Sequence, residues 1–188
     1  MNIILIGVAG SGKTTIGEKL AARLGGNWRF DDADHFHPPA NIAKMSRGVP
    51  LDDAARAPWL EALRAHLGAS AVRGEHVILA CSALKESYRR QLADTPGPTR
   101  FVYLKSSFAI LRRRLRTRRG HYMKATLLRS QFEALEEPAP ETALVIDATL
   151  APDEIVRRIL QDNGLPAPRG DSSPRPAQLP SWTKRSSP

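Results

Sequence analysis

The chain has 188 residues, of which 41% are hydrophobic and 25% charged, close to the averages of globular proteins. This length and composition predict one compact domain and exclude a wholly disordered, collagen-like or disulfide-stapled chain. The formal net charge is +9, but residues 112–124 contribute +7 and residues 164–188 a further +3, so the remaining residues sum to −1.

Short apolar runs alternate with helical patterns along the chain. Strands are expected at 2–6, 28–32, 76–81, 100–104 and 143–146, most of them short apolar runs. Helices are expected at 13–24, 53–67, 84–92, 126–136 and 153–161, and around an apolar stripe of Phe108, Leu111 and Leu115. Pro58 lies near the start of its helix or breaks it. The alternation predicts an α/β fold with parallel strands and helices on both faces of the sheet.

The C-terminal segment differs in composition from the rest. From Gly164 onward, 25 residues contain six prolines and five serines and almost no apolar side chains. Such a segment buries too little surface to order itself. We therefore expect a domain over 1–163 and a disordered tail over 164–188.

Targeting signals are absent from the sequence. No apolar run approaches the roughly 20 residues of a membrane span, and the N-terminus lacks the pattern of a signal peptide. Cys81 is the only cysteine, so an intrachain disulfide is impossible. A cytoplasmic protein with no membrane partner is expected.

A glycine-rich segment follows the first expected strand and opens the first expected helix. It matches G-x-x-x-x-G-K-[ST] through Gly7, Val8, Ala9, Gly10, Ser11, Gly12, Lys13 and Thr14. In such a loop backbone N–H groups surround phosphates, the lysine reaches the β- and γ-phosphates, and the hydroxyl ligates Mg²⁺. ATP and Mg²⁺ are therefore the expected cofactors. The GTPase alternative has only Asp94–Gly97 in its favour, which follows a helix and reads as a turn.

Two carboxylates follow the second expected strand. Asp32 and Asp34 lie on the same side of an extended backbone, at the strand end where parallel sheets bind ligands. One would hold Mg²⁺ and the other would accept the proton of an attacking hydroxyl. The alternative is a polar helix-capping loop. Ser82 and Lys85, after the third strand, are expected to face the same site, and Cys81 reads as a small core residue.

The basic segment suits the transfer of a phosphoryl group, because arginines stabilise its negative charge. Arg114 and Arg118 share a helix face, and we expect both at the ATP site, with Arg118 the stronger candidate for catalysis. Gly120 is a candidate hinge of a small arginine-rich lid. The histidines show no spacing typical of a zinc site.

Together with these residues, further segments resemble small P-loop kinases of the gluconokinase family, related to shikimate and nucleoside monophosphate kinases. The resemblance covers about residues 2–162. Its segments include Asn41 with Lys44-Met45, Pro50–Asp53 with Arg56 and Pro58–Leu60, Cys81–Lys85 with Tyr88-Arg89, Tyr103–Lys105, Arg118–His121 with Lys124, and Ser130–Phe132 with Leu135 and Pro138. Ala33 and the tail depart from the family pattern.

The resemblance implies a five-stranded parallel sheet, often a homodimer, and ATP-dependent phosphorylation of D-gluconate at its 6-hydroxyl. Asp34 would then be the base and Asp32 would assist Mg²⁺. Arg56 is the candidate for the gluconate carboxylate, because guanidinium binds it bidentately. Weaker candidates are His37, Lys85 and Arg89.

Two alternative functions stay open. Another small-molecule kinase, such as a shikimate kinase, is disfavoured because the third strand ends in Cys-Ser-Ala-Leu-Lys and lacks a glycine triplet. A nucleic-acid-binding NTPase would use the segment 112–124 and the basic tail. The nearly neutral body disfavours it, and no nucleic-acid partner is expected.

Overall fold

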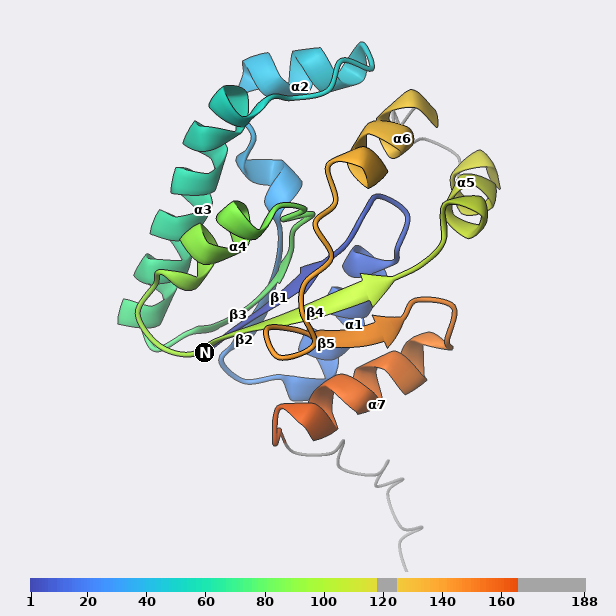
Figure 1. Ribbon diagram of the computed structural model, residues 1–188. Helices are drawn as coiled ribbons and strands as arrows, with labels where there is room; N and C mark the ends of the chain where they lie inside the picture. Colours follow the sequence, from blue (N-terminus) through green and yellow to red (C-terminus); the bar gives the residue numbers. More distant parts are fainter. Residues whose placement is uncertain (118–124, 166–188) are drawn as a thin grey trace, which may run out of the picture.

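A parallel sheet of five strands forms the centre of the molecule (Figure 1). The computed structural model describes residues 1–117 and 125–165. The strand order is β2-β3-β1-β4-β5, and every neighbouring pair is parallel. The strands are β1 (Asn2–Ile6), β2 (Trp28–Asp32), β3 (His76–Ala80), β4 (Thr99–Lys105) and β5 (Leu144–Asp147). The expected five-stranded α/β fold is confirmed.

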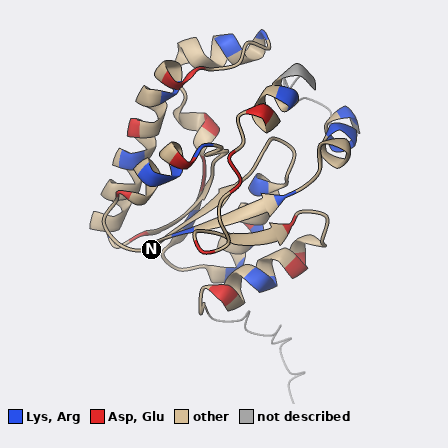
Figure 2. Ribbon diagram, in the orientation of Figure 1, with Lys and Arg blue, Asp and Glu red and all other residues tan. Residues whose placement is uncertain are grey.

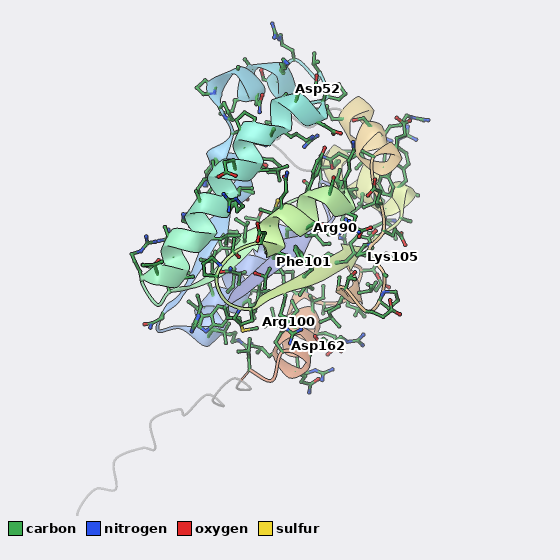
Figure 3. All side chains as sticks on the ribbon, turned by 60° about the vertical axis from the view of Figure 1, so that its left-hand side comes forward. Asp52, Arg90, Arg100, Phe101, Lys105 and Asp162 are labelled. Atoms are coloured by element: carbon green, nitrogen blue, oxygen red, sulfur yellow. The ribbon has the colours of Figure 1, made fainter. Side chains whose placement is uncertain are left out.

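Alternate residues of β1 enter two separate cores, because successive side chains of a strand point to opposite faces. Ile3 and Leu5 pack with α1 (Lys13–Leu24) and α7 (Pro152–Asp162) on one face. Ile4 and Ile6 pack with α3 (Asp53–Val72) and α4 (Glu86–Ala93) on the other. In Figure 3, α3 and α4 lie in front of the strands. The fully buried β1 therefore lies in the middle layer of a three-layer fold.

Two further helices, α5 (Phe108–Thr117) and α6 (Ala125–Glu133), pack against each other beside the loop that follows β1. Their buried residues Leu111 and Leu128 form a third cluster with Val8 of that loop and Leu84. In Figure 2, α5 carries basic residues and no acidic ones. Leu111 of its apolar stripe is fully buried and Phe108 and Leu115 are half-buried, whereas three of its arginines, Arg112, Arg113 and Arg116, are exposed.

Between β2 and α3 no helix was expected, and the extended backbone expected at Asp32 and Asp34 is wrong at Asp34, because Asp32 caps a short helix there. This segment forms a 3₁₀ helix, η1 (Ala33–Phe36), and the short helix α2 (Pro39–Ser46) with proline at its first position. Helix α3 continues five residues beyond the expected end, and Pro58 lies within it without ending it. Asp52 caps α3 by accepting a hydrogen bond from the Ala55 N–H at 2.7 Å.

The first two residues of the expected tail, Gly164 and Leu165, are hydrogen-bonded to the end of α7. Gly164 has φ +59°, its N–H donates to the Gln161 carbonyl, and the Leu165 N–H donates to the Leu160 carbonyl at 2.9 Å. This is the hydrogen-bond pattern of a Schellman motif at the end of α7, and Leu165 packs against the core. The remaining expected tail, residues 166–188, lies outside the described residues. Within the described part of the chain, no helix is both long and apolar enough to cross a membrane.

Candidate active site

The glycine-rich segment, hereafter the P-loop (residues 7–14), connects β1 to α1. Gly7 has φ +137°, and a Cβ there would lie 2.9 Å from the Leu104 carbonyl oxygen, so only glycine fits. Gly12 precedes α1 with φ +99° and offers no side-chain cap. The first N–H groups of α1 therefore remain available to an anion. The Lys13 ammonium donates to the Gly7 and Val8 carbonyls at 2.9 and 3.1 Å, which keeps it over the loop.

Two oxygen donors lie beside the P-loop. The Thr14 hydroxyl donates to Asp32 Oδ2 at 3.1 Å, while Asp32 Oδ1 accepts from the Asp34 N–H at 3.1 Å. Gly17 allows this approach of β2 to α1, because a Cβ there would collide with the Phe30 ring. A hydroxyl and a carboxylate oxygen next to a phosphate loop are the donors that Mg²⁺ takes together with substrate phosphates. The two residues therefore fit a magnesium ion.

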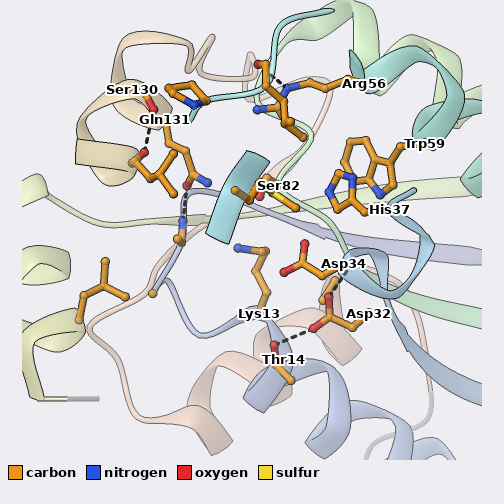
Figure 4. A pocket seen from close by; sticks show the side chains of 18 of the residues that line it. Lys13, Thr14, Asp32, Asp34, His37, Arg56, Trp59, Ser82, Ser130 and Gln131 are labelled. Carbon is orange, nitrogen blue, oxygen red and sulfur yellow. Dashed lines mark hydrogen bonds between the residues drawn. The ribbon is translucent and has the colours of Figure 1, made fainter. Parts of the chain in front are cut away.

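A pocket of about 320 Å³ extends from the P-loop across the carboxyl ends of the strands (Figure 4). This is where ligands bind in parallel α/β sheets. Its wall includes most of the residues selected from the sequence, namely Ala9, Gly10, Gly12, Lys13, Thr14, Asp32, Asp34, His37, Arg56 and Ser82. The residues from the two sides of the expected site thus line one space.

Cys81, directly after β3, is a buried thiol close to the charged groups of this site. Burial raises the pKa of the Cys81 thiol to about 12, and the charges of Lys13, Asp34 and Arg56 also act on it. All three side chains line the same pocket as Ser82, the residue after Cys81 (Figure 4). The high pKa also fits the expected core role of Cys81, because the thiol is not ionised at neutral pH.

His37 and Trp59 form a stacked pair in the pocket wall, with ring centroids 4.5 Å apart and planes at 10°. Trp59 is fixed by its indole N–H, which donates to the Ala33 carbonyl at 2.7 Å. His37 Nδ1 is buried without a hydrogen-bond partner among the described residues. Burial, and secondarily the charge of Arg56, lowers the pKa of His37 to about 4. At neutral pH this imidazole is a neutral group able to bind a ligand hydroxyl.

Arg56 lies on the first turns of α3 and lines the same pocket. Its Nε donates to the Leu51 carbonyl at 3.3 Å, which orients the guanidinium. The two terminal nitrogens carry the remaining N–H groups, in the fork geometry that suits a carboxylate.

The structure does not bring Lys85 and Arg89 to the pocket. Lys85 Nζ is held by the Asp53 carboxylate at 2.7 and 2.8 Å, and the Tyr88 hydroxyl donates to the same carboxylate. Arg89 is buried and donates to the Ala83 and Leu84 carbonyls at 3.1 and 3.0 Å. Ala83 has φ +35°, so Arg89 supports an unusual backbone turn. The sequence placed both residues beside the site, but their side chains are used to join α4 to its surroundings.

The predicted arginines of the phosphate site fall in two groups. Arg114 Nη2 donates to the Ala148 carbonyl at 2.8 Å, in the loop between β5 and α7. Arg118 and the expected hinge Gly120 lie outside the described residues. The roles of the arginines stay predictions.

Of the P-loop, Gly7, Val8 and Ser11 are not part of the pocket wall within the described structure, because Val8 and Ser11 are buried behind it.

Several pocket residues received no role from the sequence. They come from several separate elements and comprise Thr15, Met45, Pro50, Leu51, Trp59, Ala80, Leu115, Leu127, Ser130 and Gln131. The available signal was the family resemblance, whose segments include Met45, Pro50, Leu51, Trp59, Ser130 and Gln131. Gln131 stands out, because its side chain accepts a hydrogen bond from the P-loop at Ala9.

Comparison with known proteins agrees with this geometry. A family model described as an AAA domain matches residues 3–138. A probable gluconokinase of Xenopus tropicalis is 46% identical over 78% of this chain and 85% of its own length. Among solved structures, a sugar kinase from Janibacter sp. HTCC2649 has a TM-score of 0.82 at 39% identity, with 87% and 94% of the two chains covered. A gluconokinase from Sinorhizobium meliloti 1021 has a TM-score of 0.76 at 42% identity, with 85% and 89% covered. The chain therefore belongs to the gluconokinase family.

Proposed function

We propose that the protein transfers the γ-phosphoryl group of ATP to the 6-hydroxyl of D-gluconate, giving 6-phosphogluconate and ADP. The observation that carries this proposal is the single pocket in which the P-loop residues Lys13 and Thr14 meet Asp34, His37 and Arg56. Groups that bind phosphate and groups suited to a hydroxylated carboxylate thus line the same pocket.

Asp34 receives the proton of the acceptor. As the oxygen of the 6-hydroxyl forms its bond to phosphorus, the bond from phosphorus to the bridging oxygen of ATP breaks, and the hydroxyl proton passes to the Asp34 carboxylate. Lys13 is placed beside the P-loop carbonyls, where its charge stabilises the negative charge on the moving group.

Thr14 and Asp32 are the residues that hold Mg²⁺. When bound, the ion neutralises charge on the phosphate oxygens. Asp32 has a second task without the ion, because its Oδ1 binds the Asp34 N–H and so fixes the backbone of the proposed base.

Arg56 and His37 recognise the acceptor. Arg56 binds the carboxylate, and the neutral His37 exchanges hydrogen bonds with hydroxyls along the sugar-acid chain. A neutral sugar would leave Arg56 without its partner, which is the source of discrimination. Arg114 and Arg118 contribute positive charge at the phosphate side, with Arg118 the catalytic candidate.

An assay of ATP consumption across a panel of acceptors tests the proposal. We expect D-gluconate to exceed glucose, shikimate and nucleoside monophosphates by roughly 10²-fold or more in kcat/KM. Phosphorus NMR of the product should show a phosphate ester on a primary carbon. Equal rates with glucose and gluconate would contradict the acceptor assignment and leave only the kinase class.

The nucleic-acid alternative is tested in the same assay. We expect DNA and RNA neither to stimulate ATP consumption nor to bind tightly at physiological salt. Sub-micromolar, salt-sensitive binding in a protein without sugar-acid kinase activity would reverse the assignment.

A further inference from the structure

A side chain far away in the sequence binds the P-loop backbone. Gln131 of α6 accepts a hydrogen bond from the Ala9 N–H through Oε1 at 2.6 Å. Ala9 is the third residue of the P-loop, and both Ala9 and Gln131 line the pocket that contains Lys13. Figure 4 shows the Gln131 side chain reaching from α6 towards the loop, with its amide on the pocket side.

The direction of this hydrogen bond fixes the orientation of the amide. A backbone N–H is only a donor, so the atom facing Ala9 is the carbonyl oxygen Oε1. The amide nitrogen Nε2 shares its carbon with Oε1 and therefore stays beside the P-loop. Its two N–H groups are hydrogen-bond donors, as are the backbone N–H groups of the loop itself.

The helix that carries Gln131 is held firmly against the P-loop. Leu128 is fully buried with Val8 and Leu111, and the Phe132 ring meets Phe108 edge-on with centroids 5.4 Å apart. Leu115 of α5 packs at Gly10, where an added Cβ would lie 3.3 Å from its side chain. The amide of Gln131 is thus preorganised relative to the loop, so little ordering is needed to use it.

We infer that Gln131 is a further phosphoryl-binding residue, whose Oε1 is anchored on the Ala9 N–H while Nε2 donates to an oxygen of the transferred phosphoryl group. This inference rests on the proposed phosphoryl transfer. A phosphoryl group is the ligand we assign because the anchor is the phosphate loop itself. A neutral amide supplies hydrogen bonds to the phosphoryl oxygens and adds no positive charge to that of Lys13.

Two variants of Gln131 separate this role from a structural one. Gln131→Glu keeps an acceptor for the Ala9 N–H but removes both donors, whereas Gln131→Met removes acceptor and donors at similar length. Glu133→Gln is the matched control, because Glu133 lies on the same helix but is exposed and is not part of the pocket wall. Unfolding temperatures verify that each variant is folded.

Two readouts are measured for each variant. We expect both Gln131 variants to lower kcat for gluconate by roughly 10-fold to 10²-fold, in the range known for loss of a transition-state donor. Titration calorimetry should show that both lose most of the preference for a non-hydrolysable ATP analogue over ADP, with ADP affinity changed less than about twofold. Glu133→Gln should retain both properties.

Three outcomes are informative in different ways. A Gln131→Glu enzyme that matches wild type would overturn the inference, because an acceptor for Ala9 would then be enough. Loss in Gln131→Glu with full retention in Gln131→Met would also overturn it, since only the added charge would matter. If the wild type binds ATP but does not phosphorylate gluconate, the proposed acceptor fails, and calorimetry still decides the role of Gln131.

Discussion

The phosphate side and the acceptor side of the pocket are built by different means. The phosphate side is one continuous stretch, residues 7–14, whose binding groups are backbone N–H groups and one lysine. The acceptor side is assembled from η1, the start of α3 and the end of β3, and its binding groups are side chains. Gln131 adds a side chain from outside the stretch to the phosphate side, because it reaches the P-loop from α6.

This difference has a physical consequence for variation. A backbone cradle depends on glycine conformations such as those of Gly7 and Gly12, which few substitutions tolerate. A wall of side chains depends on each residue separately, so substrate preference can change while the phosphate chemistry stays. Substitutions on the acceptor side should therefore alter gluconate parameters, and those on the phosphate side should alter turnover with any acceptor.

Asp34→Asn should have the largest effect. The amide keeps the size of the side chain but cannot accept the hydroxyl proton, so we expect kcat to fall by about 10³-fold. ATP affinity measured by calorimetry should change little. Asp31→Asn is the matched control, because its carboxylate is bound by Arg29 and His66. Normal turnover in Asp34→Asn would move the base to another group, Asp32 being the next candidate.

Lys13→Ala should lower turnover by roughly 10²-fold or more, since it removes a charge that stabilises the transition state. The unfolding temperature should hardly move, because the two hydrogen bonds of the ammonium go to carbonyls of the P-loop itself and join it to no other element. Lys19→Ala serves as control, as this lysine of α1 pairs with Asp153 at the surface. An active Lys13→Ala enzyme would refute the P-loop assignment.

Arg56→Ala should act on the acceptor alone. Loss of a charge-assisted contact is expected to raise the KM for gluconate by roughly 10-fold to 10²-fold and to leave the KM for ATP nearly unchanged. Arg64→Ala, on the same helix but paired with Glu61 at the surface, should leave both constants unchanged. An equal rise in both KM values would show that the two sides are not separable.

The pH dependence of stability should report the buried His37. Its pKa is about 4 in the folded protein and about 6.5 when unfolded, so only the unfolded chain takes up this proton as the pH falls below 6.5. Between pH 7 and pH 5 the free energy of unfolding of the wild type should fall by about 2 kcal/mol more than that of His37→Gln. Below pH 4 the difference between the two proteins should stop growing. Urea unfolding of both proteins at pH 7, 5 and 4 measures this, and parallel curves would contradict it.

The smallest effect is expected at the C-terminus, far from either side of the pocket. Truncation after Leu165 should leave stability and kinase activity unchanged. Truncation after Asn163 removes the Schellman hydrogen bonds and the Leu165 contact, and should cost about 1 kcal/mol without loss of activity. Thermal unfolding of the two truncated proteins measures this difference. Equal unfolding temperatures would show that the packing of Leu165 does not contribute to stability.

Regular patterns made much of the fold predictable. All five strands were assigned to within one residue at each end. Four of them lie on short, mainly apolar runs, which are typical of buried parallel strands, whereas β2 is Trp-Arg-Phe-Asp-Asp. The segment 33–46 was missed, since η1 and α2 are short and polar and Pro38-Pro39 reads as a loop. The proline at the first position of α2 was the available signal. Gly164 was read as part of the tail, although a glycine after a helix also marks a C-cap.

By itself, the sequence determined what depends on local spacing. The phosphate cradle is local, because its eight residues supply both the glycine conformations and the lysine, and the strand and helix around it follow from periodicity. Tertiary structure decided which distant side chains share the pocket. It assigned Lys85 to Asp53 and Arg89 to the turn at Ala83, and it brought Gln131 to Ala9 across 122 residues of sequence. Such choices depend on which partner lies within hydrogen-bond distance after packing, and residue spacing along the chain carries no measure of that distance.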